Sequence, residues 1–155
     1  MKIYKFLFAL SFIVLFTSCN NNEPKFIKTW ESVRVAFPYK AYLKINKDYT
    51  FNFNGGACLS RFYSKGKWKE KNDTIILNSI VPSKCLYTME FGINCVKFNA
   101  DNNLYRETTI KNCEPNNGEE YVNFKNEKFY IKSDTLKFIA KQKNCPTRND
   151  FFLKK

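Results

Sequence analysis

Apolar and polar residues alternate along much of the chain with a period of two. Apolar side chains occupy alternate positions in residues 41–45 and again in 49–53, and the triplet Asn-Lys-Asp lies between these runs at 46–48. A period of two places successive side chains on opposite faces of a strand. After Pro24 no apolar stripe at helical spacing continues for more than a turn or two. The pattern therefore predicts an all-β fold.

A second hairpin is predicted further along. The residues around Trp68 lead through Asn72-Asp73 into the apolar run at 75–77. About ten short strands joined by local turns can form an antiparallel up-and-down meander that closes into a barrel. A two-sheet sandwich is the alternative that the pattern leaves open.

Two late segments of the chain repeat earlier ones in the same order. Residues 71–77 return as 132–138, and a second echo relates 45–51 to 98–104. Such turns are common in meanders, but the preserved order leads us to interpret the echoes as an internal duplication. The predicted halves are about 27–91 and 92–155.

The beginning of the chain has a different pattern. Lysines at positions 2 and 5 precede an apolar run at 6–16, and Thr17-Ser18-Cys19 follow. A charged start, an apolar run of this length and a small residue before the cleavage point are the parts of a secretory signal. The run is shorter than the roughly 20 apolar residues of a membrane-spanning helix. With its cysteine, the arrangement resembles the signal of bacterial lipoproteins.

The lipoprotein resemblance implies processing and anchoring. A peptidase would remove residues 1–18, and Cys19 would become an acylated N-terminus that carries palmitate or a related chain and holds the protein to a lipid membrane. Residues 19–26 would form a tether, and 27–155 a single β domain. Because asparagines follow Cys19, without the Asp that resembles an inner-membrane retention signal, we expect the outer membrane, periplasmic or surface-facing. An ordinary secreted protein is the alternative.

The charge of the chain is strongly positive. It has 26 Lys and Arg, 14 Asp and Glu, no His, and a net charge of +12. The absence of histidine removes imidazole metal sites and Ser-His-Asp or Cys-His catalysis. The positive charge predicts weak attraction to polyanions, but the lysines are spread along the sequence, so we expect no dedicated basic patch. Export argues against nucleic acid as a partner.

Five cysteines remain beside Cys19, and an exported protein favours disulfides. Equivalent positions in the two halves favour equivalent bonds. The predicted disulfides are Cys58–Cys85 and Cys113–Cys145. Cys95 is then a free thiol, which we expect to be inert because nothing near it in sequence would activate the thiolate. The spacing lacks the close pairs of zinc sites, so neither a metal site nor a cofactor is predicted.

Acidic residues after 113 are the other candidate chemistry. Glu119 or Glu120 would suit a carboxylate-dependent glycoside hydrolase if a second carboxylate faced it across a pocket. The candidates for that second carboxylate are Glu90, Glu107 and Asp101. Because the run is rich in Pro, Asn and Gly, a solvated hairpin loop is the simpler interpretation, and no catalytic residue is assigned.

The strand-and-turn phrase at 43–51, followed by Gly66-Lys67-Trp68, resembles the lipocalin-like small lipoproteins of Bacteroidota over about residues 28–80. The resemblance implies a lipocalin-like barrel. We therefore expect a non-enzymatic, membrane-anchored module that binds an envelope protein or a small apolar or glycan ligand, through residues that the sequence does not identify. An inhibitor of an exogenous hydrolase and the glycoside hydrolase are the alternatives.

Overall fold

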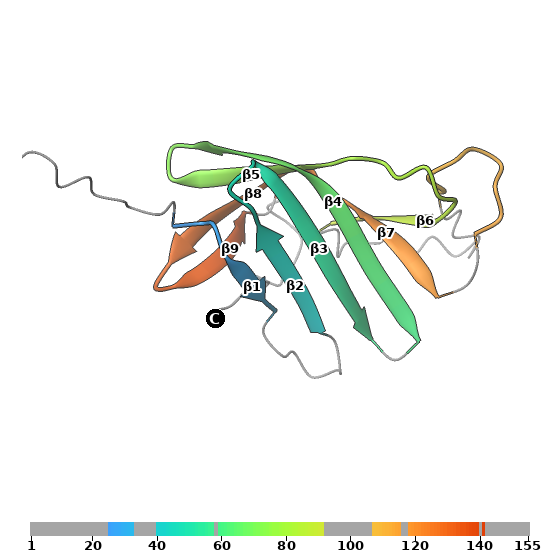
Figure 1. Cartoon of the computed structure of the whole chain (residues 1–155), viewed down its shortest axis with the longest axis horizontal. Helices are drawn as coiled ribbons and strands as arrows, with labels where there is room; N and C mark the ends of the chain where they lie inside the picture. Colours follow the sequence, from blue (N-terminus) through green and yellow to red (C-terminus); the bar gives the residue numbers. More distant parts are fainter. Residues whose placement is uncertain are drawn as a thin grey trace, which may run out of the picture.

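The computed structural model describes residues 25–32, 40–57, 59–91, 107–115, 118–139 and 141 (Figure 1). These residues form nine strands and no helix, which confirms the all-β prediction. The strands are β1 (Thr29–Glu31), β2 (Lys40–Ile45), β3 (Thr50–Ala57), β4 (Ser60–Lys71), β5 (Thr74–Ser79), β6 (Tyr87–Glu90), β7 (Glu119–Asn123), β8 (Lys125–Lys132) and β9 (Thr135–Ile139).

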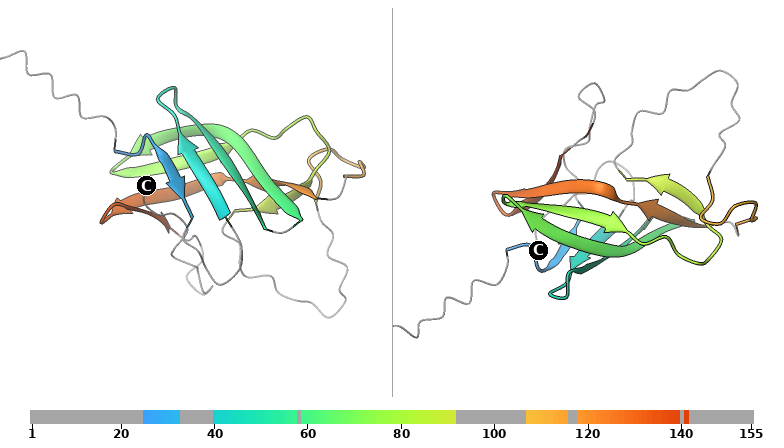
Figure 2. Two further views of the ribbon diagram at one scale, coloured as in Figure 1. Left: turned by 60° about the horizontal axis from the view of Figure 1, so that its bottom comes forward. Right: turned by 90° about the horizontal axis from the view of Figure 1, so that it is seen from above.

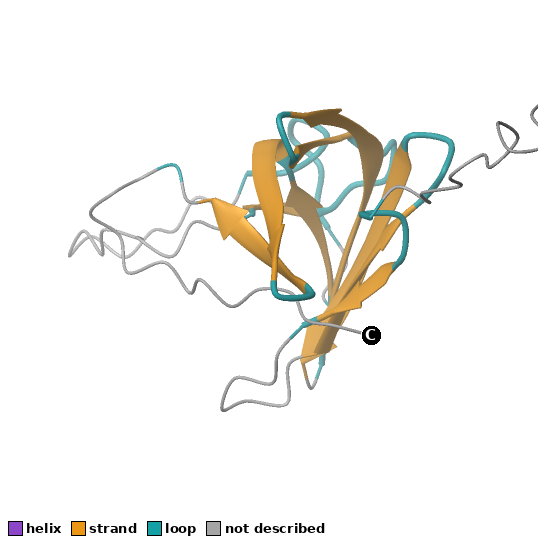
Figure 3. Ribbon diagram, turned by 90° about the vertical axis from the view of Figure 1, so that its left-hand side faces the viewer, coloured by secondary structure: helices purple, strands orange, loops and turns teal. Residues whose placement is uncertain are grey.

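All nine strands belong to one curled sheet. The main path runs β1-β2-β3-β4-β5-β8-β9, and every pair of neighbours along it is antiparallel. Seen from the side in Figure 3, the strands curve around an interior in a nearly closed, barrel-like shape. The predicted antiparallel sheet that closes toward a barrel is confirmed for this path.

The sheet forks at β4. The predicted meander did not include this fork. The second half of β4 pairs with β5, whereas its first half pairs in parallel with β7 through Arg61, Phe62 and Tyr63. Strand β6 pairs in parallel with β7 and lies off the main path, as Figure 2 also shows. Beyond β7 the chain changes partner at Phe124 and continues as β8 along β5.

Two serine hydroxyls lie at the fork. Ser64 of β4 and Ser79 at the end of β5 are hydrogen-bonded, with 2.7 Å between their Oγ atoms. The Phe124 amide donates to the same Ser79 Oγ at 2.9 Å, and the Ser79 amide donates to the Phe124 carbonyl at 2.8 Å. At this point the backbone hydrogen bonds between neighbouring strands are interrupted. The bonds of Ser64, Ser79 and Phe124 satisfy polar groups there, as buried backbone groups require.

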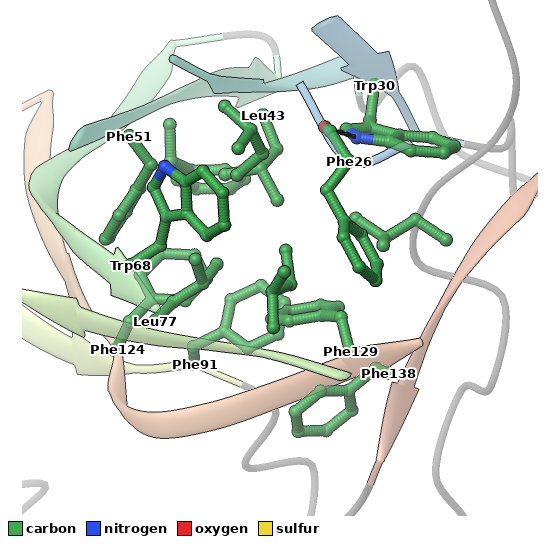
Figure 4. Close-up of a cluster of buried hydrophobic side chains, with 14 of the residues drawn as sticks. Phe26, Trp30, Leu43, Phe51, Trp68, Leu77, Phe91, Phe124, Phe129 and Phe138 are labelled. Atoms are coloured by element: carbon green, nitrogen blue, oxygen red, sulfur yellow. Dashed lines mark hydrogen bonds between the residues drawn. The ribbon is translucent and has the colours of Figure 1, made fainter. Parts of the chain in front are cut away.

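Alternation along the strands builds one aromatic core. In β2 the side chains of Ala41, Leu43 and Ile45 are buried and the intervening ones are exposed. Phe26 is also fully buried in this core, so the folded domain includes the last residue of the predicted tether. Figure 4 shows the cluster and the hydrogen bond from Trp30 Nε1 to the carbonyl of Phe26, 3.1 Å long.

Phenylalanine rings from facing strands meet inside the sheet. Neighbouring ring centroids lie 4.3 to 6.1 Å apart, within the range of stacked and edge-to-face contacts. The rings are those of Phe51, Phe53, Phe91, Phe124, Phe129 and Phe138. In this part of the interior, side chains occupy the place where a lipocalin-type cavity would lie (Figure 4).

The residues on which the lipocalin-like resemblance rests, 43–51 and 66–68, form one structural unit. Trp68 Nε1 donates to the carbonyl of Asn46 in the β2–β3 turn at 3.0 Å, and the Trp68 ring lies 5.3 Å from that of Tyr49. Asp48 Oδ1 accepts from the Thr50 amide at 3.1 Å, as turn aspartates commonly do. The tryptophan thus holds the β2–β3 turn against β4.

The two repeated turns adopt the same conformation. Asn72 and Asp73 join β4 to β5, Ser133 and Asp134 join β8 to β9, and all four have φ between 48° and 58°. Two consecutive positive φ values are typical of type I′ hairpin turns. The second echo, at 98–104, lies outside the described residues, so the duplication stays a prediction.

Candidate functional site

A group of lysines gathers on the outer face of the sheet. Its members lie on β2, β4 and β8, have exposed side chains, and point away from the core. We call this group the basic face and define it by six lysines: Lys44, Lys65, Lys67, Lys69, Lys71 and Lys128. Lys40, which forms a salt bridge with Glu31, and Lys132 also point outward from β2 and β8 and are not counted in the group. Alternate positions of β4 contribute four of the six, because the intervening positions face the core.

The strand register brings these lysines together although they are dispersed in sequence. Lys69 lies opposite Ile76, which in turn lies opposite Lys128, so one row crosses β4, β5 and β8. A second row joins Lys44 and Lys65 through Asn52. Paired residues of neighbouring strands share a face of the sheet. The lysines therefore form a continuous surface.

The positive charge of the basic face is not neutralised within the described part of the chain. The only exposed Asp or Glu in β2, β3, β4, β5 or β8 is Glu70, which by the alternation of β4 lies on the same side as Trp68 and opposite to these lysines. None of the six lysines forms a salt bridge with another described residue. The expectation that the lysines form no patch is therefore wrong, because it considered their spacing in sequence and not the register of the strands.

One disulfide is present among the described residues, and it differs from the predicted pairing. Cys85 and Cys113 bond to each other, so the predicted bonds Cys58–Cys85 and Cys113–Cys145 are both wrong. The segments beside the bond are also hydrogen-bonded: the Thr109 amide donates to the Leu86 carbonyl at 3.0 Å. The repeat argument failed because the segment 107–115 pairs directly with the start of β6 through the antiparallel bridge Tyr87–Thr108, a contact that the repeat did not predict.

The carboxylates proposed for hydrolysis are not brought together as a facing pair. Glu119 and Glu120 are successive residues of β7 and point to opposite faces. Glu90 pairs with Asn123, four positions from Glu119, which is about 13 Å along the strand and beyond the separation used by glycosidases. Glu119 forms a salt bridge with Lys84, and Glu107 is exposed. Asp101 lies outside the described residues.

A buried carboxylate that sequence reasoning missed lies on β8. Glu127 is 2% exposed and shares the inward face of its strand with Phe129. Its Oε1 atom accepts a hydrogen bond from Lys141 Nζ, which also donates to the Lys125 carbonyl. Oε2 is buried without a hydrogen-bond partner among the described residues. The sequence did contain a signal, because Glu127, Phe129 and Ile131 occupy alternate positions and therefore lie on one face of a strand.

Burial raises the pKa of Glu127, and the nearby charge of Glu90 acts in the same direction. The hydrogen bond and charge of Lys141 act against this shift. Glu90 itself accepts a hydrogen bond of 2.8 Å from Asn123 Nδ2. Because Glu127 is almost fully covered, we interpret the Glu127–Lys141 pair as an internal link between β8 and the chain just beyond β9, and not as a site that contacts a substrate.

Replacing Glu127 by glutamine is expected to remove a pH-dependent part of the stability. The raised pKa means that the native protein holds this proton more tightly than the unfolded chain. Wild-type stability should be fully present below the ordinary pKa of glutamate and decrease as pH rises through the raised native pKa. Urea unfolding at several pH values should show that E127Q lacks this decrease, so that its stability rises relative to the wild type as the pH increases.

The matched control is E119Q. The hydrogen bond and charge of Lys84 lower the pKa of the exposed Glu119. Any contribution of Glu119 to stability is therefore lost as the pH falls, whereas the contribution of Glu127 is lost as the pH rises. E119Q should therefore keep the wild-type decrease in stability toward higher pH. An E127Q curve that runs parallel to the wild-type curve would contradict the assignment.

Several predicted site residues lie outside the described part of the chain: Cys19, Cys58, Cys95 and Cys145. Among the residues that are described, no group of three or more His, Cys, Asp or Glu side chains is placed to hold a metal ion. The same residues include no helix long and apolar enough to cross a membrane.

Comparison of the chain with protein families, with curated proteins and with solved structures gave no significant match. The described residues define a curled nine-stranded sheet with an aromatic core and a basic outer face.

Proposed function

We propose that this chain is a lipid-anchored binding module of the bacterial cell envelope and not an enzyme. The observation that carries the proposal is a lipoprotein-like N-terminus ahead of a compact β domain with an exposed, unneutralised basic face. Such a domain offers a recognition surface, whereas the described carboxylates lack the facing arrangement that hydrolysis requires.

The start of the domain supports an anchored arrangement. Lys25 forms a salt bridge with Asp73 in the β4–β5 turn, and Phe26 is buried directly after it. The folded domain therefore begins within a few residues of Cys19, and acyl chains there would hold it close to the membrane surface. Because aromatic side chains fill the core, the structure supports a proposal in which a ligand contacts the outside of the sheet.

Intact mass of the protein extracted from bacterial membranes tests the proposal. We expect the mass of residues 19–155 increased by the acyl groups on Cys19, because more than one chain gives stable anchoring. Density-gradient separation should place this form with the outer membrane.

The variant C19S provides the control, since it keeps the apolar run but removes the acylated thiol. It should be recovered without acyl groups, and not in the membrane fraction that contains the acylated wild-type protein. A wild-type protein of unacylated mass in the soluble fraction would overturn the proposal.

A further inference from the structure

We infer that the basic face binds a linear acidic polysaccharide. The inference rests on the proposed envelope location and specifies the ligand class for the binding module. Its basis is the row of lysines along β4 together with the lysines that neighbouring strands place beside it.

The spacing of the lysines suits a polymer with repeated charges. Lys65, Lys67, Lys69 and Lys71 occupy every second position of β4, so their Cα atoms lie about 7 Å apart along the strand. Lys128 lies two strands from Lys69, at about 10 Å across the sheet. A chain with one acidic group on each sugar or each pair of sugars would contact several of these ammonium groups at once.

The surface between the lysines offers polar contacts for sugar hydroxyls. Asn52 lies between Lys44 and Lys65, and Asn78 lies opposite Lys67. Tyr130, which is 37% exposed, lies beside Thr74 in the row that contains Lys71. Carboxamide and hydroxyl groups can hydrogen-bond to sugars, and an exposed ring gives a flat apolar contact.

The shape of the face favours a polymer over a lipid surface. Sheets twist, and the outside of a curled sheet is convex, so a flexible chain can follow a row of cations that a planar bilayer would touch only in part. Stable interfacial binding also requires apolar side chains that insert between lipids. On the basic face two of the seven residues paired with the lysines are apolar, and the seven are Thr29, Thr50, Asn52, Thr74, Asn78, Ile76 and Ile139.

Binding of the full-length protein to heparin and to polygalacturonate, with neutral dextran as a reference, tests the inference. The critical variant is K67Q/K69Q, which removes two central charges and keeps side chains of similar length. We expect it to weaken binding to both acidic polymers by about tenfold or more, since two central ammonium groups no longer attract the polymer's anionic groups. Wild-type binding should also weaken steeply with added salt.

The matched control is K84Q/K111Q, which removes the same charge from exposed positions away from the basic face. This variant should bind like the wild type. Equal weakening by both variants would show an effect of net charge alone and overturn the inference, as would undiminished binding by K67Q/K69Q. Wild-type binding to anionic lipid vesicles or duplex DNA, without binding to either acidic polysaccharide, would also overturn it.

The intact mass of the protein in the same samples shows whether Cys19 is acylated, and it separates the proposed anchoring from the proposed ligand class. Unacylated protein that binds polysaccharide through the basic face would overturn the anchored location and leave the ligand class intact. Acylated protein that fails to bind either acidic polysaccharide would overturn the ligand class and leave the location intact.

Discussion

Replacing Gly66 by alanine is expected to destabilise the protein by about 3 to 5 kcal/mol or to prevent folding. A Cβ atom at this position would lie 2.1 Å from the Asn78 carbonyl oxygen and 2.6 Å from Cε1 of Phe51. The first contact is with the backbone of β5, so no side-chain rotation relieves it. Soluble yield and urea unfolding followed by circular dichroism measure the effect.

The control for this substitution is K67A, at the exposed neighbouring position. It should change the free energy of unfolding by no more than about 0.5 kcal/mol. The double variant F51L/G66A should recover little stability, because the contact with the Asn78 carbonyl remains. A G66A protein as stable as K67A would contradict the close approach of β4 and β5 at this point.

Removing the Cys85–Cys113 bond is expected to cost about 3 to 4 kcal/mol. The bond closes a loop with a sequence separation of 28 residues, and the chain-entropy estimate for a loop of this size gives that magnitude. The variant C85S/C113S should therefore unfold at lower urea concentration than the oxidised wild type. The segment 107–115 should also become more accessible to protease, because the disulfide and the backbone bridge Tyr87–Thr108 hold it against β6.

Reduced wild-type protein is the matching reference for C85S/C113S. The two should have equal stability when both are measured under reducing conditions, since each then lacks the Cys85–Cys113 cross-link. Peptide mapping of the oxidised protein should recover Cys85 joined to Cys113. A peptide that joins Cys58 to Cys85 would restore the pairing expected from the repeat and contradict the structure.

Local patterns in the sequence were sufficient to predict much of the fold. The alternation at 41–45 correctly identified β2 and its buried side, and the Asn-Lys-Asp and Asn-Asp segments correctly marked two hairpin turns. These features depend on the geometry of one strand or one turn, in which period-two alternation and turn residues have direct physical meaning. The all-β class and the curled antiparallel sheet followed from them.

The features that bear on function depended on which strands are neighbours. The antiparallel bridge between Tyr87 and Thr108 brings the segment of Cys113 beside Cys85, although their spacing in the repeat suggested other partners. Strand register gathers lysines from β2, β4 and β8 into the basic face, and closure of the sheet buries Glu127. The sequence by itself determined which side of a regularly alternating strand such as β2 faces the core, because that choice is local. Only the tertiary structure decided which outward side chains lie together, because pairing between distant strands is not encoded in the period of either one.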